Sequence, residues 1–298
     1  MANDKILEVK DLSVSFNTYA GEVKAVRGVS FELNRGETLA FVGESGCGKT
    51  VTAKSILRLL KPPFAVIKEG SQITCDGKDV LALNKKELCE FRGDEVSMIF
   101  QDPMTSLNPT MTVGKQIMES LRIHRHLSKK EAREEAIRML KMVNIPSAEK
   151  RVDSYPHEMS GGMRQRVMIA MALACNPKIL IADEPTTALD VTIQAQIMSL
   201  LKELREEIGM SIILITHDIG LVASMADRVL VMYAGQIIEE APAKEIFRAP
   251  RHPYTKALLA TVPSIYDGDD RELVSIPGIV PEGYDDIPGC RFADRCEY

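Results

Sequence analysis

A glycine-rich stretch early in the chain has the residue types and spacing of a phosphate-binding loop. Its glycines would let backbone N–H groups turn toward phosphate oxygens. Lys49 could reach the β- and γ-phosphates, and the Thr50 hydroxyl could bind Mg²⁺. The stretch fits G-x-x-x-x-G-K-[ST] at every fixed position, and it consists of Gly43, Glu44, Ser45, Gly46, Cys47, Gly48, Lys49 and Thr50, followed by Val51.

The residues on either side of this stretch decide between a nucleotide site and a chance glycine turn. The short apolar run 37–42 predicts a strand before it, and the helical spacing of 50–60 predicts a helix after it. That is the context in which the motif binds nucleotides, and a helix N-terminus adds a favourable dipole for phosphate. Cys47 occupies a free position of the motif, either as filler or as a thiol that makes the site sensitive to alkylation.

Two acidic residues follow a run of apolar residues in the second half of the chain. Residues 179–182 predict a strand buried on both faces, with Asp183 and Glu184 at its end. In a P-loop enzyme, Asp183 would hold Mg²⁺, and Glu184 would polarise the attacking water. Taken alone, the two acids could equally be solvated groups at a strand end. Lys49 and Thr50 upstream favour the catalytic interpretation.

A serine and two glycines, Ser160, Gly161 and Gly162, precede a predicted helix at 163–174. A helix N-terminus of this kind can bind phosphate, although it could also be a simple N-cap. The segment resembles the ABC signature, usually LSGGQ, with methionine in place of the leucine and of the glutamine. The resemblance implies that this loop faces the phosphate loop of a second subunit across ATP.

Further residues follow in the order that the ABC family has them. Gln101, after a predicted strand at 96–100, resembles the Q-loop residue, which contacts Mg²⁺ and the transmembrane partner. Ala188-Leu189-Asp190 resembles the D-loop, in which Asp190 crosses the dimer interface. His217, after a predicted strand at 211–216, resembles the switch histidine that senses the γ-phosphate.

One aromatic residue upstream of the phosphate loop is the candidate for stacking on adenine. This residue is Tyr19, and Phe16 lies close to it in the sequence. An aromatic ring can stack on a base because both present a flat π-face. We expect Tyr19 to take this role.

The elements that position these residues predict an α/β protein. Strands alternate with helices, which implies a largely parallel sheet, while the N-terminal segments alternate apolar and polar residues, as antiparallel strands do. We expect a P-loop ABC ATPase fold with a mixed central sheet, an antiparallel β subdomain and a helical subdomain. Further strands are predicted at 6–16, 29–33, 178–182 and 228–233, a hairpin at 71–81, and helices at 129–143, 193–208 and 220–225.

The chain divides into an ATP-binding domain at 1–245, with its helical subdomain at about 103–177, and a C-terminal extension at 246–298. The extension is rich in proline and is expected to form short helices and turns. Several segments resemble the ATP-binding subunits of oligopeptide and dipeptide importers, although nickel and some sugar importers share the C-terminal region. The segments are 101–109, 252–255, 276–278 and 289–296.

This resemblance implies an ATP-hydrolysing subunit that powers import of di- or oligopeptides. Its partners would be a second ABC ATPase subunit, two transmembrane permease subunits and, indirectly, an extracytoplasmic peptide-binding protein. A heterodimer is favoured over a homodimer. Import of nickel or another small solute is an alternative, and a soluble ABC ATPase acting on DNA or ribosomes is another. A P-loop kinase or GTPase is a further alternative. Such proteins lack a loop like that of residues 160–162, and the Asn-Lys-x-Asp segment by which GTPases recognise guanine is not found in this sequence.

Composition agrees with a peripheral protein at the cytoplasmic face of a membrane. The 298 residues are 45% hydrophobic and 27% charged, with a formal net charge of -5. This charge does not suggest a nucleic-acid binder, which normally has a basic face, although an acidic protein can still carry a local basic patch. No apolar stretch approaches the roughly 18 residues that span a bilayer. The N-terminus has no signal-peptide pattern.

Two cysteines near the end of the chain, Cys290 and Cys296, raise the question of an iron–sulfur cluster. In many members of the peptide-importer subfamily, two further cysteines follow, and the four resemble a [4Fe–4S] site. A cluster of that type needs four thiolate ligands. We expect the chain as given not to hold a complete cluster.

Overall fold

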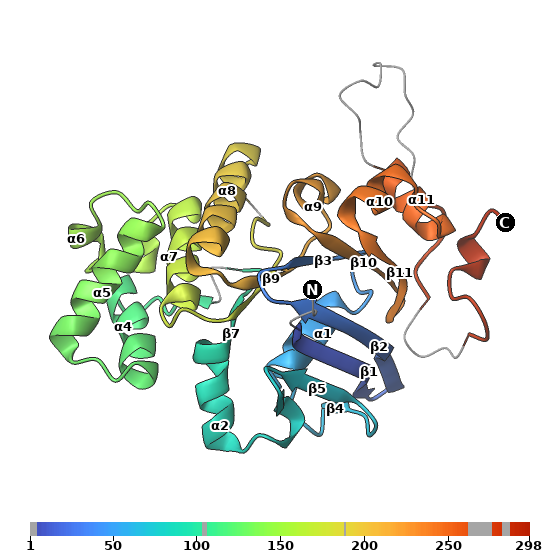
Figure 1. Ribbon diagram of the computed structural model, residues 1–298, viewed down its shortest axis with the longest axis horizontal. Helices are drawn as coiled ribbons and strands as arrows, with labels where there is room; N and C mark the ends of the chain where they lie inside the picture. Colours follow the sequence, from blue (N-terminus) through green and yellow to red (C-terminus); the bar gives the residue numbers. More distant parts are fainter. Residues whose placement is uncertain (1–4, 103–105, 188, 262–275, 282–286) are drawn as a thin grey trace. The chain divides into compact units, whose positions relative to one another are not determined.

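The computed structural model describes residues 5–102, 106–187, 189–261, 276–281 and 287–298. The chain forms two compact units, one made of Met1–Ala82 and Leu214–Tyr298, the other of Leu83–Ile213. Strand β9 (Ser211–Ile215) carries the chain from the second unit into the first. Figure 1 labels most of the helices and strands of both.

The first unit contains an antiparallel sheet built on two long strands, β1 and β2. Leu7 pairs with Leu33, and Val9 with Phe31; all four side chains are buried, because alternate residues of a strand point to the same face. The sheet order is β2-β1-β5-β6, with β4 beside β1. The strands are β1 (Lys5–Thr18), β2 (Gly21–Asn34), β4 (Ala65–Ile67), β5 (Gln72–Cys75) and β6 (Lys78–Asp79).

The first unit also contains three strands with mixed pairing. β3 (Thr38–Val42) is buried at every residue and pairs in parallel with β10 (Arg228–Tyr233). β10 pairs antiparallel with β11 (Gln236–Pro242). The predicted strands at β3 and β10, and the mixed sheet, are therefore confirmed. β11 was not predicted, because its residues are half-exposed along most of the strand.

The second unit joins a parallel strand pair to a group of helices. β7 (Val96–Ile99) pairs with β8 (Ile179–Asp183), and α4, α5 and α7 contact one another (Figure 1). Helix α4 buries Val113, Ile117 and Leu121, which share one face at a spacing of four residues. The helices are α2 (Lys85–Glu90), α4 (Val113–His124), α5 (Lys129–Met142), α6 (Ala148–Arg151), α7 (Gly161–Leu173) and α8 (Val191–Ile208).

The C-terminal residues of the first unit form short helices and turns over the part of the chain described, as predicted. Tyr254 is fully buried, and its ring lies 4.7 Å from that of Tyr233 and 5.3 Å from that of Phe292. The helices are α9 (Ile219–Met225), α10 (Ala243–Arg248) and α11 (Pro253–Ala260). Within the described residues, no helix is both long enough and apolar enough to span a membrane.

Candidate functional site

The phosphate loop leaves β3 at Val42 and enters α1 (Lys49–Ile56) through tightly packed glycines. Gly48 precedes the helix with φ of 104°, which favours glycine. A Cβ atom at Gly43 would lie 2.2 Å from the Met232 carbonyl oxygen, and one at Gly48 would lie 2.7 Å from the Ala25 carbonyl oxygen. No larger residue fits either position, so this backbone can form only with glycine there.

The lysine of the motif is buried inside this loop. Lys49 is only 6% exposed, and its Nζ donates to the carbonyl oxygens of Gly43 at 2.7 Å and Glu44 at 2.9 Å. Thr50 and Val51 are half-buried in the first turn of α1, while Ser45 and Gly46 are exposed. A cation held over a loop that ends in a helix N-terminus fits the phosphates of a nucleotide.

Cys47 is fully buried in the same loop. Burial raises the pKa of its thiol, although the nearby Lys49 ammonium acts in the opposite direction. The Lys49 Nζ lies 3.5 Å from the sulfur. Because the thiolate is the reactive species, the structure favours the filler role over sensitivity to alkylation.

His217 and Tyr19, which belong to the same unit as the phosphate loop, are both exposed. His217 follows β9, and the next residue, Asp218, caps α9 by accepting from the Leu221 N–H at 3.1 Å. Tyr19 lies in the turn between β1 and β2. Phe16 is instead paired with Phe64, with 5.6 Å between ring centres, which leaves Tyr19 as the better adenine candidate of the two.

In the second unit, the structure brings Gln101 and Glu184 together. The Gln101 Nε2 donates to the Glu184 Oε2 at 2.7 Å, and the Thr187 Oγ1 donates to the same oxygen at 2.9 Å. Asp183 is buried at the end of β8. Glu184 has φ of 48°, a left-handed conformation that residues other than glycine rarely adopt.

The serine–glycine segment begins α7, as predicted. Ser160 is the N-cap, and its hydroxyl accepts from the Met163 N–H at 3.3 Å. A Cβ atom at Gly162 would lie 3.0 Å from Ile193 Cγ2, so the close approach of α8 favours glycine. Asp190 caps α8, accepting from the Ile193 N–H at 2.9 Å. Ala188 and residues 103–105, parts of two predicted segments, lie outside the described residues.

Two contacts near Glu184 escaped the sequence analysis. Buried Gln165 in α7 donates from Nε2 to the Pro185 carbonyl oxygen, and Thr187 binds the Glu184 carboxylate. Gln165 lies beside the signature residues in the sequence, but no local pattern pairs it with Pro185. The structure thus ties the start of α7 to the segment that holds Glu184.

The two C-terminal cysteines do not make a four-ligand site in the described part of the chain. Cys290 is exposed, with its sulfur 3.9 Å from His252 Nε2, and Cys296 is partly buried. Among the described residues, no group of three or more His, Cys, Asp or Glu side chains could hold a metal ion. Two thiols do not fit a [4Fe–4S] cluster, which needs four ligands.

Family models match most of the chain. The model described as "ABC transporter" matches residues 26–187, and that described as "Oligopeptide/dipeptide transporter, C-terminal region" matches residues 238–298. Two relatives come from Bacillus subtilis (strain 168). The oligopeptide transport ATP-binding protein OppD is 58% identical, covering 99% of this chain and 82% of the relative. The dipeptide transport ATP-binding protein DppD is 56% identical, covering 98% and 87%.

Solved structures of ATP-binding cassettes have a similar fold. A dimeric cassette in a post-hydrolysis state bound to ADP and Pi has a TM-score of 0.71 at 30% identity, covering 80% of this chain and 98% of that one. A cassette from Clostridium perfringens, part of an ABC transporter complex, has a TM-score of 0.69 at 32% identity, covering 83% and 92%.

Proposed function

The chain belongs to the ABC transporter family, and from that membership we propose that it is the ATP-hydrolysing subunit of a peptide importer. The predicted ABC ATPase fold is confirmed by the family model and by the similar cassettes. The ATPase proposal rests mainly on the phosphate loop, in which Gly43 and Gly48 are packed too closely for a larger residue and Lys49 is buried. The relatives OppD and DppD, named as oligopeptide and dipeptide transport ATP-binding proteins, support peptide as the substrate and do not favour a nickel importer.

In this proposal, the phosphate loop of residues 43–51 binds the phosphates of ATP. Lys49 exchanges the carbonyl groups of Gly43 and Glu44 for β- and γ-phosphate oxygens. Thr50, Gln101 and Asp183 would hold Mg²⁺, which supplies charge neutralisation on the phosphates when it is bound. The position of Asp183 at the carboxyl end of the buried strand β8 supports this role, because P-loop enzymes hold Mg²⁺ with an acidic residue of this kind.

Glu184 is proposed to orient the attacking water. Gln101 and Thr187 both donate to one of its carboxylate oxygens, which orients the carboxylate as a general base requires. The left-handed backbone at Glu184 supports the assignment, because such conformations occur frequently at functional sites. An amide has both a donor and an acceptor, so Gln101 can bind Glu184 and a metal ion with one side chain.

The remaining site residues are proposed to act toward the nucleotide from outside the phosphate loop. His217 would contact the γ-phosphate, and Tyr19 would stack on adenine, for which its full exposure leaves the ring accessible. Ser160, Gly161 and Gly162 would bind the nucleotide of a second ATPase subunit, with Asp190 at that interface. The exposed N-cap at Ser160 supports this, because its helix N-terminus is accessible to an anion.

The proposed assembly is a pair of ATPase subunits, preferably different ones, at the cytoplasmic face of the membrane. Two permease subunits would span the membrane, and an extracytoplasmic protein would deliver the peptide; no nucleic acid takes part. The dimeric solved cassette bound to ADP and Pi supports the pairing. We propose an ATP-binding domain at 1–245, with its helical subdomain at about 103–177, and an extension at 246–298. A [4Fe–4S] cluster would require ligands besides Cys290 and Cys296.

The proposal is tested by the Glu184→Gln variant in transporter reconstituted in vesicles. We expect ATP to bind as in the wild type, while hydrolysis and peptide uptake fall by about 100-fold or more, because the general base is lost. A fluorescent ATP analogue measures binding, phosphate release measures hydrolysis, and labelled peptide measures transport. Normal hydrolysis by the variant would refute the role of Glu184, and uptake of nickel without peptide would refute the substrate.

A further inference from the structure

Glu44, the second residue of the phosphate loop, is bound by two residues from the C-terminal part of the chain. Arg295 Nη1 donates to Glu44 Oε2 at 2.9 Å, and Nη2 donates to Oε1 at 3.1 Å. The Glu44 backbone N–H donates to the Tyr254 hydroxyl oxygen at 2.9 Å. The two-point contact of guanidinium and carboxylate is a strong, oriented form of ion pair. Glu44 is thus held by both its side chain and its backbone.

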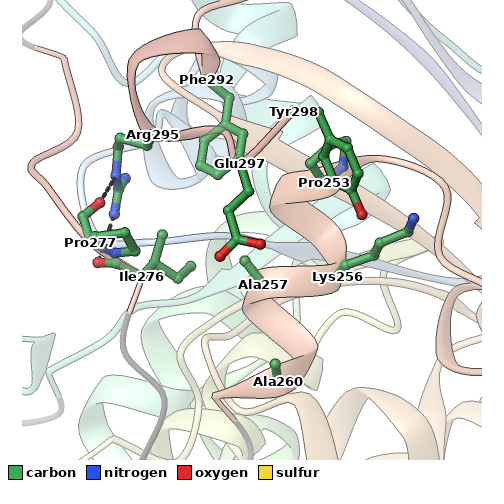
Figure 2. A pocket seen from close by; sticks show the side chains of 10 residues that line it. All are labelled: Pro253, Lys256, Ala257, Ala260, Ile276, Pro277, Phe292, Arg295, Glu297 and Tyr298. Carbon is green, nitrogen blue, oxygen red and sulfur yellow. Dashed lines mark hydrogen bonds between the residues drawn. The ribbon is translucent and has the colours of Figure 1, made fainter.

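Arg295 is itself fixed on several sides. Its Nη1 also donates to the Tyr233 hydroxyl at 3.2 Å, and its Nε donates to the Pro277 carbonyl oxygen at 2.7 Å. Figure 2 shows this side chain beside Pro277 and Phe292, at the edge of a pocket of about 220 Å³. Only 8% of the residue is exposed. A guanidinium with this many partners cannot leave Glu44 without breaking several hydrogen bonds.

Glu44 also contacts Lys49, the lysine proposed to bind ATP. The Glu44 carbonyl oxygen accepts from Lys49 Nζ, so Glu44 connects Arg295 and Tyr254 to Lys49. Without Arg295, Glu44 would place an uncompensated carboxylate in a loop that receives the negative charge of ATP. Repulsion between this carboxylate and the phosphates would oppose binding, because the two like charges would lie in the same loop.

We propose that Arg295 is a positioning residue for ATP binding, which orients the phosphate loop through Glu44 and neutralises its carboxylate. The inference rests on the proposed function and deepens it: the C-terminal part of the chain completes the nucleotide site. No local pattern could have indicated this, because Arg295 and Glu44 are 251 residues apart.

The test compares the full-length Arg295→Ala chain with a matched control, Arg228→Ala. Arg228 makes a similar two-point pair with Glu37, at 2.8 and 3.1 Å, and it pairs with Leu39 at the start of β3, away from the loop that follows Val42. We expect Arg295→Ala to raise both the Kd for a fluorescent ATP analogue and the KM for ATP by about tenfold, with kcat retained. Arg228→Ala should lower the Tm without changing either constant.

Two further variants separate charge from packing. Arg295→Lys keeps the charge but not the two-point geometry, so we expect its KM to lie between those of wild type and Arg295→Ala. In Glu44→Gln combined with Arg295→Ala, no carboxylate remains, and the KM should fall back toward the wild-type value. Both measurements use folded protein, checked by thermal unfolding.

If Arg295→Ala lowers only the Tm, as Arg228→Ala does, and leaves the Kd and the KM unchanged, the inference about Arg295 is overturned. The proposed function is not affected by that result. A double variant as impaired as Arg295→Ala would overturn the electrostatic part of it. A wild-type chain that binds no ATP analogue would instead overturn the proposed function, and the inference with it. These outcomes therefore distinguish the two proposals.

Discussion

The phosphate loop and the segment after β8 are held by different kinds of contact. In the loop, glycine backbone lies against backbone, and Lys49, Cys47 and Gly48 are buried. After β8, the half-buried Glu184 is held by two side-chain hydrogen bonds, from exposed Gln101 and from Thr187. The loop is part of a packed interior, whereas the hydrogen bonds from Gln101 and Thr187 to Glu184 come from side chains that can rotate.

This difference suits the two tasks proposed for the segments. A rigid cradle binds phosphate at small entropic cost, because it is organised before ATP arrives. A catalytic carboxylate on exchangeable hydrogen bonds can be placed for hydrolysis only when the site closes. Substitutions in the phosphate loop should therefore affect both the stability of the fold and the binding of ATP. Substitutions around Glu184 should affect only the rate of ATP hydrolysis.

The largest effect is expected for Gly43→Ala. The added methyl group would lie 2.2 Å from the Met232 carbonyl oxygen at φ of 149°, so both clash and backbone strain destabilise the variant, by about 2–4 kcal/mol. Binding of a fluorescent ATP analogue should be lost with it. Urea unfolding measures the first effect, and fluorescence titration the second.

Gly70→Ala is the control for that variant. Gly70 also has a positive φ, of 89°, but nothing lies within 4 Å of its added Cβ. We therefore expect a smaller loss of about 1 kcal/mol from backbone strain alone, with ATP binding unchanged. Equal losses in the two variants would show that close packing does not determine the shape of the loop.

A smaller effect is expected for Thr187→Val, which removes the hydrogen bond from the Thr187 hydroxyl to Glu184 with little change in shape. The kcat should fall by about fivefold, the equivalent of one hydrogen bond, while the KM for ATP stays unchanged. Thr110→Val, which removes an exposed hydroxyl that donates to Asn108 at 2.7 Å, should leave the steady-state ATPase rate as it is. A changed KM in Thr187→Val would contradict the division between binding and rate.

The sequence predicted those parts of the fold whose signals are local. β3 and β8 are nearly continuous apolar runs with every residue buried, and a glycine-rich loop after such a strand has one well-understood use. β11 escaped prediction because an edge strand with half-exposed residues shows no clear alternation. α4 was foreseen only as part of a helical region, without bounds of its own.

The site residues could also be predicted only where their sequence signals are local. Residues that act through a short motif, such as Lys49 and Glu184, could be named, although their roles remain predictions. Contacts between distant segments could not be named. Gln165 reaches the Pro185 carbonyl oxygen, and Arg295 reaches Glu44, and in both cases the partner is set by tertiary packing. A single sequence carries no record of such pairs unless a motif contains both members.

A further prediction, which leaves stability and catalysis unchanged, concerns alkylation of Cys47 by iodoacetamide in the native chain. Burial raises the pKa of the Cys47 thiol above its ordinary value of 9.0, which lowers the fraction of reactive thiolate. Cys47 is also shielded from reagent, whereas Cys89 and Cys290 are exposed. At pH 9 we expect Cys47 to react at least about tenfold more slowly than Cys89, since both charge and access are reduced.

Mass spectrometry of peptides from the alkylated chain gives the rate for each cysteine, and the urea-unfolded chain is the control, in which the rates should become similar. If native Cys47 reacts as fast as Cys89, the loop opens readily, and the contrast with the Glu184 segment fails. If Cys47 is protected in wild type but reactive in Gly43→Ala, the same glycine packing that shapes the cradle also excludes reagent from it.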